Sequence, residues 1–375
     1  MNTALGFVGM SREEIETPAL LIDLDILDKN IKTLADYYRG KKGAIFRPHQ
    51  KGHRFPAIAR KQLKAGAYGV CVTSLGLAEL YAHSGIDNIL ITSEVYGRNK
   101  IARLCGLSKS ADITVGVDNI ENVRQISKAA LDFHTKVNIA VELYLGSTSC
   151  GVELEKVKSF VKELDGFNGI NFRGLWWHDA NGMYPNFEER KKAHFQVLDG
   201  VASVKADIED AGYEVEIVSG GHTLTWNITP EYSRLTNVEV QVGNYVFSDW
   251  CSSFYEGLEA FDCALTVLTR CISRPIPSEA MFDLGLNSCS NEHTNDYRKV
   301  VGPRFKDIEG LEDITLREEL AYASCRNASR AIRPGDVFEL IPPHADTTAK
   351  LHDKYYGVRD GIVEVIWPNY GRGLF

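Results

Sequence analysis

The 375-residue chain lacks the features typical of membrane, secreted and nucleic-acid-binding proteins. No apolar run approaches the roughly 20 residues of a membrane span. The stretch from Met1 to Glu14 has no basic start followed by an apolar centre, so no secretion signal is expected. The eight cysteines form no C-x-x-C pair, which favours buried thiols in a reducing compartment. A net charge of -8 disfavours nucleic acid as a partner. We therefore expect a cytoplasmic protein that binds neither membranes nor nucleic acids.

Eight short apolar runs alternate with stretches of helical periodicity. Continuously apolar strands alternating with amphipathic helices are typical of a parallel sheet covered on both faces, and eight such units fit one (β/α)8 TIM barrel. The expected strands are Ala44 to Arg47, Gly69 to Thr73, Ile89 to Thr92, Ile113 to Asp118, Val137 to Leu143, Phe172 to His178, Glu216 to Gly220 and Val238 to Gly243. Side chains at the carboxyl ends of these strands would share one mouth.

The sequence pattern changes after about residue 255, where short runs of alternating apolar and polar residues, separated by Pro and Gly, replace the helical pattern. The runs are Phe261 to Ile272, Glu279 to Leu284, Asp336 to Ile341 and Tyr355 to Trp367. An extra strand, Ala19 to Leu24, precedes the barrel and is a candidate to join this second region. We expect a barrel at residues 26–254 and a mostly-β domain built from residues 1–25 and 255–375.

Lys51 directly follows the first expected strand, in Arg47-Pro48-His49-Gln50-Lys51-Gly52-His53. Neighbouring imidazole and guanidinium groups depress the pKa of an ammonium group, and burial at a strand end would depress it further. Both effects favour the free amine that attacks an aldehyde. A basic surface loop is the alternative.

Two glycine-containing loops follow the last two barrel strands: Ser219-Gly220-Gly221-His222-Thr223 and Gly243-Asn244-Tyr245. Backbone N–H groups and hydroxyls in such loops can surround a phosphate, and this is the usual phosphate position of the fold. Gly221 is expected to allow close approach of the phosphate, whereas tight-turn geometry is the alternative. An amine-reactive lysine together with a phosphate site predicts pyridoxal 5'-phosphate held as an imine.

These motifs resemble the D-threonine aldolase and D-serine dehydratase-like family, whose members are metal-dependent pyridoxal phosphate enzymes with the alanine racemase fold. The family has a similar Arg-Pro-His-x-Lys-x-His motif and uses its lysine for the cofactor. The resemblance runs from Thr17-Pro18-Ala19-Leu20 to Trp367-Pro368 and implies a homodimer. It implies that the cofactor is held by Lys51, Arg47, His49, Ser219, Gly220, Gly221, Thr223, Gly243, Asn244 and Tyr245.

Pro342-Pro343-His344-Ala345-Asp346 resembles the divalent-metal motif of the same family. On an extended strand, alternation would point His344 and Asp346 to one side, and imidazole with carboxylate suits Mn, Zn, Co or Mg. Such a metal would lower the pKa of a substrate β-hydroxyl. The aldolase branch tends to have Asp at the second position, where the dehydratase branch tends to have Cys. A hydrogen-bonded surface histidine is the alternative.

His178 ends the sixth expected strand, where it is either a catalytic residue or a hydrogen-bonded core histidine. The dehydratase-like branch has a similar histidine, whereas the aldolases tend to have Tyr. Ser149 replaces the family's arginine that faces the pyridine nitrogen, Tyr184 replaces an aldolase histidine, and Asn287 replaces a lysine.

The resemblance therefore implies a lyase that cleaves a D-configured β-hydroxy-α-amino acid, of the D-threonine or 3-hydroxyaspartate type, to an aldehyde and glycine. The alternatives are a D-serine-type dehydratase, which would yield a keto acid and ammonia, and a pyridoxal phosphate homeostasis protein without turnover. The extra β-domain and the pairing of His344 with Asp346 disfavour a binding protein.

Overall fold

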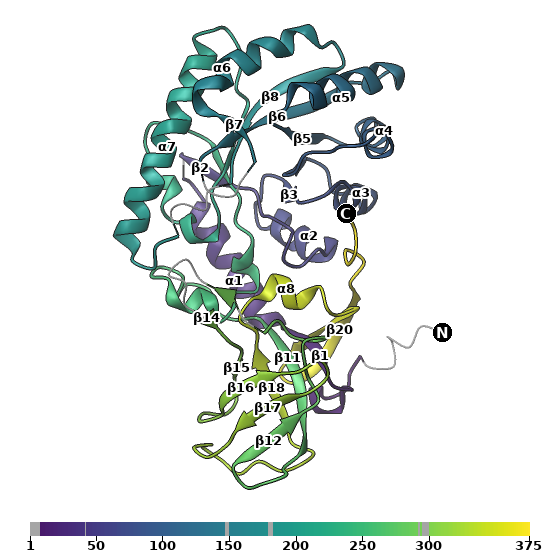
Figure 1. Cartoon of the computed structure of the whole chain (residues 1–375), viewed down its shortest axis with the longest axis vertical. Helices are drawn as coiled ribbons and strands as arrows, with labels where there is room; N and C mark the ends of the chain where they lie inside the picture. The colour runs from purple at the N-terminus through teal and green to yellow at the C-terminus, as the bar shows by residue number, and fades with distance from the viewer. Residues whose placement is uncertain (1–7, 42, 147–149, 179–182, 292, 295–299) are drawn as a thin grey trace. The chain divides into compact units, whose positions relative to one another are not determined.

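The computed structural model describes residues 8–41, 43–146, 150–178, 183–291, 293–294 and 300–375 (Figure 1). The chain divides into two compact units. The first consists of Met1–Thr33 and Asn244–Arg372, and we call it the β unit. The second consists of Leu34–Gly243 and Gly373–Phe375, and we call it the barrel unit.

Eight parallel strands of the barrel unit reproduce the eight expected from the sequence. They are β2 (Ala44–Phe46), β3 (Val70–Val72), β4 (Ile89–Ile91), β5 (Ile113–Val117), β6 (Val137–Tyr144), β8 (Ile170–Trp176), β9 (Ile217–Gly220) and β10 (Val238–Val240). Their order is β2-β10-β9-β8-β6-β5-β4-β3, and the short β7 (Val152–Glu153) pairs with β6. An isolated parallel bridge between His49 and Cys71 joins the two ends of this order. The eight strands therefore form the parallel barrel that the sequence predicts.

Helices follow the strands and flank the parallel sheet (Figure 1). They are α2 (Pro56–Lys64), α3 (Leu75–His83), α4 (Arg98–Leu107), α5 (Ile120–Asp132), α6 (Leu154–Glu163) and α7 (Phe187–Glu209), with α1 (Leu24–Tyr38) preceding β2. Local sequence sets where they begin: the side chains of Ser74, Asn119 and Asn186 accept hydrogen bonds from backbone N–H groups at the starts of α3, α5 and α7. None of the helices in the described part of the chain is both long and apolar enough to cross a membrane.

Four side chains from four different strands pack together inside the barrel: Cys71, Leu90, Ala140 and Trp176. Because side chains alternate along a strand, residues two positions beyond them point to the same side, one layer nearer the strand ends. Glu142 on β6 is one such residue, and it pairs in register with Trp176 on β8. The inner face of the sheet therefore carries polar groups toward its carboxyl end.

Arg47 forms a buried ion pair inside the barrel. Its guanidinium donates to both carboxylate oxygens of Glu239 (2.7 and 2.9 Å) and to Asn88 O (2.9 Å), and the Arg47 and Glu239 side chains are 1% and 4% exposed. Asn88 precedes β4, so Arg47 reaches toward the amino ends of the strands. This placement corrects the expectation that Arg47 binds the cofactor, because its donors are committed to structural partners.

Replacing Glu239 with Gln is expected to lower the free energy of unfolding by about 3 kcal/mol or more, because it leaves a buried guanidinium without its counter-charge. Urea denaturation measures the loss. Glu121→Gln is the matched control, since Glu121 pairs with Arg124 at the surface and should cost less than about 1 kcal/mol. Equal losses in the two variants would contradict the prediction.

The β unit is a largely antiparallel sheet with strand order β16-β17-β12-β11-β1-β19-β20. These strands are β16 (Glu312–Leu316), β17 (Ala321–Ser324), β12 (Glu279–Phe282), β11 (Leu265–Ser273), β1 (Ala19–Asp23), β19 (Lys354–Arg359) and β20 (Ile362–Pro368), while β18 (Val337–Ile341) pairs with β11 and with β15 (Arg304–Phe305). The expected N-terminal strand is β1, which lies between β11 and β19. Asp360 and Gly361 turn the β19–β20 hairpin with φ values of 49° and 76°, the positive values typical of a tight hairpin turn. Separately, β13 (His293–Thr294) pairs with β14 (Val300–Val301), and α8 (Ala345–Ala349) follows β18.

Candidate active site

Three loops that follow β2, β10 and β9 meet at one end of the barrel unit. The His49 N–H donates to Val242 O (2.8 Å), and a Cβ added to Gly243 would lie 3.4 Å from His49 Cβ. The Gly243 N–H donates to the hydroxyl of Thr223 (3.1 Å). The lysine loop and the two glycine loops are therefore neighbours at the carboxyl ends of their strands, the end that carries the chemistry in this fold.

His49 connects the lysine loop to the barrel. Its Nδ1 accepts from the Lys51 N–H (3.3 Å), which leaves Nε2–H to donate to Thr92 Oγ1 (3.0 Å). Burial is the main cause that lowers the pKa of His49 well below its ordinary value of 6.5, and the nearby Lys51 and His178 lower it further. His49 is therefore neutral at physiological pH and fixes the backbone that carries Lys51.

Because the pKa of His49 is lower in the folded chain than in the unfolded chain, the unfolded state binds an extra proton below about pH 6.5. We expect stability to fall as the pH drops from 7 to 5, and His49→Gln should reduce that fall by about 1 kcal/mol. Urea denaturation at the two pH values measures the difference. His83→Gln, a change at an exposed histidine of α3, should follow the wild-type curve, and identical pH dependence in all three proteins would refute the prediction.

Lys51 and His178 are both exposed. The chain leaves the sheet at Phe46, and the following residues form a turn that carries Lys51 out of the strand. The expectation that the strand end buries Lys51 is therefore wrong. His178 lies two residues beyond the end of β8, and its effect on the pKa of His49, smaller than that of burial, indicates that the two imidazoles lie near each other.

Contacts within the protein and backbone conformation explain the two glycines in the loop after β9. A Cβ on Gly220 would lie 2.2 Å from the Trp177 ring. Gly221 has a φ of +72°, and a Cβ there would lie 3.0 Å from Thr225 Oγ1. Close packing at Gly220 and turn geometry at Gly221 therefore account for glycine at the two positions.

Ser219 is fully buried inside the barrel. Its hydroxyl donates to Glu239 O (3.3 Å) and accepts from Gln241 Nε2 (3.0 Å). Ser219 therefore supports the strand below the loop. Thr223 holds the β9 and β10 loops together through Gly243, as described above.

Asn244 and Tyr245 belong to the β unit, in a short 3-10 helix, Asn244–Val246. Asn244 Nδ2 donates to Asp249 Oδ2 (2.9 Å) and to Ser252 Oγ (3.1 Å). Tyr245 is 1% exposed and packs edge-on against Phe261. Both residues therefore have defined structural partners within their unit.

His344 and Asp346 do not lie on an extended strand, which corrects that expectation. Pro342 and Pro343 follow β18, His344 is the N-cap of α8, and Asp346 lies in the first turn of this helix. The His344 Nδ1 accepts from the Thr347 N–H (3.3 Å), and Asp346 is 4% exposed. His344 therefore caps the start of a helix: its Nδ1 is the acceptor for one of the free N–H groups of the first turn.

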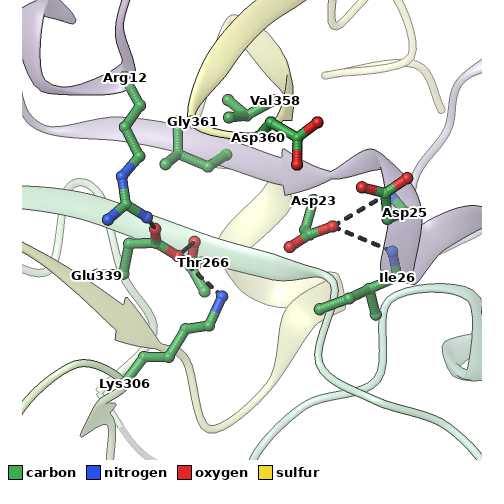
Figure 2. Close-up of a pocket in the computed structure, with 11 residues that line it drawn as sticks. Arg12, Asp23, Asp25, Ile26, Thr266, Lys306, Glu339, Val358, Asp360 and Gly361 are labelled. Atoms are coloured by element: carbon green, nitrogen blue, oxygen red, sulfur yellow. Dashed lines mark hydrogen bonds and ion pairs between the residues drawn. The ribbon is translucent and has the colours of Figure 1, made fainter.

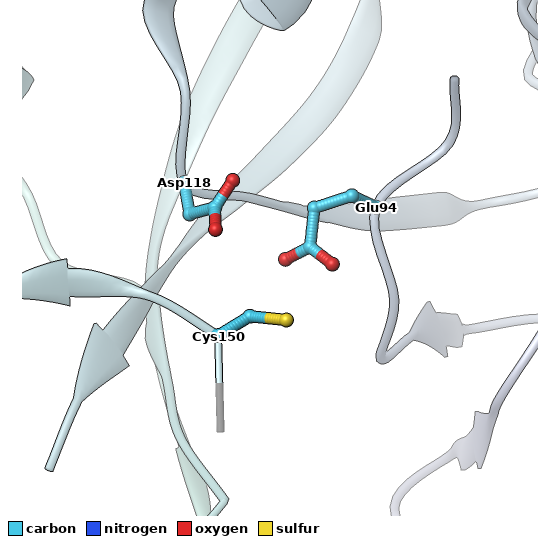
Figure 3. A group of neighbouring side chains, drawn as sticks. All are labelled: Glu94, Asp118 and Cys150. Atoms are coloured by element: carbon cyan, nitrogen blue, oxygen red, sulfur yellow. The ribbon is translucent and has the colours of Figure 1, made fainter. Parts of the chain in front are cut away.

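Another group of potential metal ligands, Glu94, Asp118 and Cys150, stands out in the described part of the chain (Figure 3). One ligand atom from each lies within 4.8 Å of the others. Glu94 and Asp118 follow β4 and β5, and Cys150 lies beyond β6. The strand pattern predicts Asp118 at the mouth but does not single out Glu94 or Cys150. All three residues follow adjacent strands, and this position after neighbouring strands is the sequence signal that identifies them.

A cavity of about 280 Å³ in the β unit is lined by charged side chains of both signs (Figure 2). Glu339 pairs with Arg12 and with Lys306 (3.2 Å), and accepts from Thr266 Oγ1 (3.0 Å). Asp23 accepts from two N–H groups at the start of α1. These contacts are structural, and we assign no ligand to this cavity.

Three positions depart from the family pattern, and the structure describes two of them. Ser149 lies outside the described residues. Tyr184 precedes α7 and is 41% exposed, and its carbonyl accepts from Arg190. Asn287, in the β unit, donates to Glu319 Oε1 (2.6 Å).

Comparison with known proteins shows what this arrangement is similar to. Residues 22–248 match the family model described as "Alanine racemase, N-terminal domain", and residues 264–358 match "Putative serine dehydratase domain". The chain is 31% identical to a D-threonine aldolase of Arthrobacter sp, over 96% of this chain and 93% of that protein. It is 31% identical to a 3-hydroxy-D-aspartate aldolase of Paracoccus denitrificans (strain Pd 1222), over 97% and 94%.

The crystal structure of D-threonine aldolase from Filomicrobium marinum is similar to this chain with a TM-score of 0.91 and 30% identity, over 98% of each chain. The similarity covers both units. The chain therefore belongs to the alanine racemase N-terminal domain family, among the members that are followed by a serine dehydratase-type domain.

Proposed function

We propose that this protein is a pyridoxal 5'-phosphate-dependent lyase that cleaves a D-configured β-hydroxy-α-amino acid to an aldehyde and glycine. The observation that carries the proposal is the exposed Lys51, in a loop held by neutral His49 beside the glycine loops after β9 and β10. The names of two relatives, D-threonine aldolase and 3-hydroxy-D-aspartate aldolase, support a substrate of the D-threonine or 3-hydroxyaspartate type.

The residues of the barrel mouth fit the cofactor that the family implies. An exposed amine is the group that binds its aldehyde, and the adjoining Gly221, Thr223 and Gly243 loops would hold its phosphate through backbone N–H groups. The hydrogen bond between Gly243 and Thr223 keeps these loops together. When bound, the cofactor supplies an electron sink for the substrate.

The chain's own residues would then position the lysine and move the proton. His49 orients Lys51 through its backbone N–H and is itself held by Thr92. We assign proton transfer to the imidazole of His178, since it is exposed at a strand end of the mouth and lies near His49. Arg47 and Ser219 are left as structural supports of the barrel.

We assign a divalent metal, Mn, Zn, Co or Mg, to His344 and Asp346, as the family resemblance implies. Imidazole and carboxylate are suitable metal ligands. If Nε2 of His344 bound the metal, Nδ1 would carry the proton and would donate to Thr347 Oγ1 (3.3 Å) in place of accepting from the Thr347 N–H. The metal would supply Lewis-acid polarisation of the β-hydroxyl. The cluster of Glu94, Asp118 and Cys150 is the competing location.

A product assay on D-threonine, D-3-hydroxyaspartate and D-serine tests the proposal, with aldehyde, glycine, ammonia and keto acid measured separately. We expect equal amounts of aldehyde and glycine from the first two substrates. Ammonia and keto acid would instead establish the dehydratase, which His178 and the serine dehydratase-type domain favour. Cofactor binding without any product would establish a homeostasis protein.

We further propose that the protein is a cytoplasmic homodimer, as the resemblance implies. Light scattering coupled to size-exclusion chromatography should give twice the mass of the 41.8 kDa chain. A monomeric mass for the active protein would remove this proposal.

A further inference from the structure

Beyond the lysine and phosphate loops, an acidic cluster occupies the far side of the barrel mouth. Figure 3 shows Glu94, Asp118 and Cys150 turned toward a shared space. The Gly151 N–H donates to Asp118 Oδ2 (3.3 Å), and a cavity of about 720 Å³ is lined by Asp118 and Cys150. Asp118 and Cys150 therefore border a cavity whose other lining residues lie mainly on α6 and at the start of α5.

Glu142 is the fourth member and is only 3% exposed. Burial is the main cause that raises the pKa of Glu142 to about 10, followed by its hydrogen bond with Glu94 and by the charges of Glu94 and Asp118. Glu142 and Glu94 therefore form a hydrogen-bonded carboxyl pair inside the barrel, with Asp118 beside it. Within the described ranges, no ion pair joins these three carboxyl groups to a lysine or arginine.

Two buried polar atoms in this region lack hydrogen-bond partners among the described residues. They are Oε1 of Glu94 and Nε1 of Trp176. Trp176 is 3% exposed, packs inside the barrel against Gly116 and is paired in register with Glu142. A buried polar group without a partner is costly, so the acceptor on Glu94 in particular indicates a missing donor.

The order of the strands indicates which part of the cofactor would face this cluster. Three strands separate β2 from β6 in either direction around the barrel, so β6 lies opposite the strand that leads to Lys51. In pyridoxal phosphate, the ring nitrogen is para to the carbon that bears the aldehyde. A cofactor attached to Lys51 therefore directs its ring nitrogen across the mouth, toward β6 and its neighbour β5.

We propose that the Glu94–Glu142 carboxyl pair binds the cofactor's ring nitrogen in its protonated form, with the pyridinium N–H donating to Glu94. The inference rests on the cofactor assignment of the proposed function and extends it. The negative charges of Glu94 and Asp118 stabilise a proton taken from solvent onto the nitrogen. A pyridinium ring is the stronger electron sink, so the pair sets the reactivity of the cofactor.

A divalent cation fits this cluster less well. Burial, followed by the charge of Glu94, raises the pKa of the Cys150 thiol. Metal sites need deprotonated thiol and carboxyl ligands. A pyridinium N–H needs only the acceptor that Glu94 already offers.

The test uses the purified holoprotein loaded with cofactor labelled with ¹⁵N in the ring. We expect a pyridinium resonance in the wild type and a neutral pyridine resonance in Glu142→Gln and Glu94→Gln. We also expect the wild type to bind pyridoxal phosphate about tenfold more tightly than its 1-deaza analogue, and Glu142→Gln to lose that preference. Glu153→Gln, an exposed change of equal charge nearby, should behave as the wild type.

The two wild-type measurements decide the question even where a variant fails to fold. A neutral ring nitrogen in the wild type, or equal affinity for the two compounds, would overturn the proposal. So would stoichiometric metal that is lost in Asp118→Asn. A protein that binds the cofactor as pyridinium but cleaves no β-hydroxy amino acid would overturn the proposed reaction alone, whereas a protein that binds no cofactor would overturn both.

Discussion

Lys51→Ala is expected to abolish covalent attachment of the cofactor and to reduce turnover by about 10³-fold or more. The exposed Lys51 is the amine that the structure places beside the loops after β9 and β10. Without it, the cofactor would keep only its phosphate and ring contacts. The visible absorption of the purified protein, together with mass spectrometry after borohydride reduction, measures attachment.

The matched control is Lys64→Ala, which removes an exposed lysine from the last turn of α2. This variant should retain the absorption band, the reduced peptide containing Lys51 and full turnover. A borohydride-stable adduct at full occupancy in Lys51→Ala would show that another lysine carries the cofactor.

The barrel could be predicted because its strands are short, apolar runs separated by amphipathic helices. Each of the eight strands expected from the sequence has its counterpart among β2 to β10, and the extra strand before the barrel is β1. Burial on both faces of a parallel sheet makes such strands apolar throughout, so the pattern is visible without any structure. Contacts that depend on strand register could not be predicted in the same way.

The position of Glu142 inside the barrel is known only from the strand register. In the sequence Glu142 is, like Asn138, a polar residue in a largely apolar run, Val137–Tyr144. Only the pairing of β6 with β8, and the inward direction shared with Ala140, place it inside the barrel with Glu94. Arg47 shows the converse, since its motif predicted a ligand contact but its side chain completes a buried pair with Glu239.

The metal motif shows a limit of local pattern. Alternation predicts that His344 and Asp346 share one side of a strand, but α8 begins immediately after His344. Two prolines end the strand because proline lacks the N–H that a sheet ladder needs. The directions of the His344 and Asp346 side chains are therefore set by the first turn of a helix and not by a strand.

Removing divalent metal with a chelator is expected to reduce turnover by about 10³-fold or more, equivalent to roughly 4 kcal/mol of transition-state stabilisation. The cofactor should remain attached, because Lys51 needs no metal to hold it. Addition of Mn, Co, Zn or Mg should restore activity to the stripped protein. Elemental analysis alongside the absorption spectrum follows metal and cofactor independently.

Variants then locate the metal. Asp346→Asn keeps the size of a buried side chain but removes its charge, so it should lose both bound metal and turnover while keeping the cofactor band. Asp353→Asn, an exposed change of equal charge in the β unit, should retain metal and activity. Asp118→Asn separates the two candidate locations, because it should leave the metal in place if His344 and Asp346 bind it. Metal retained in Asp346→Asn and lost in Asp118→Asn would move the site to the cluster of Glu94, Asp118 and Cys150, and full turnover by metal-free protein would exclude a metal role in the reaction.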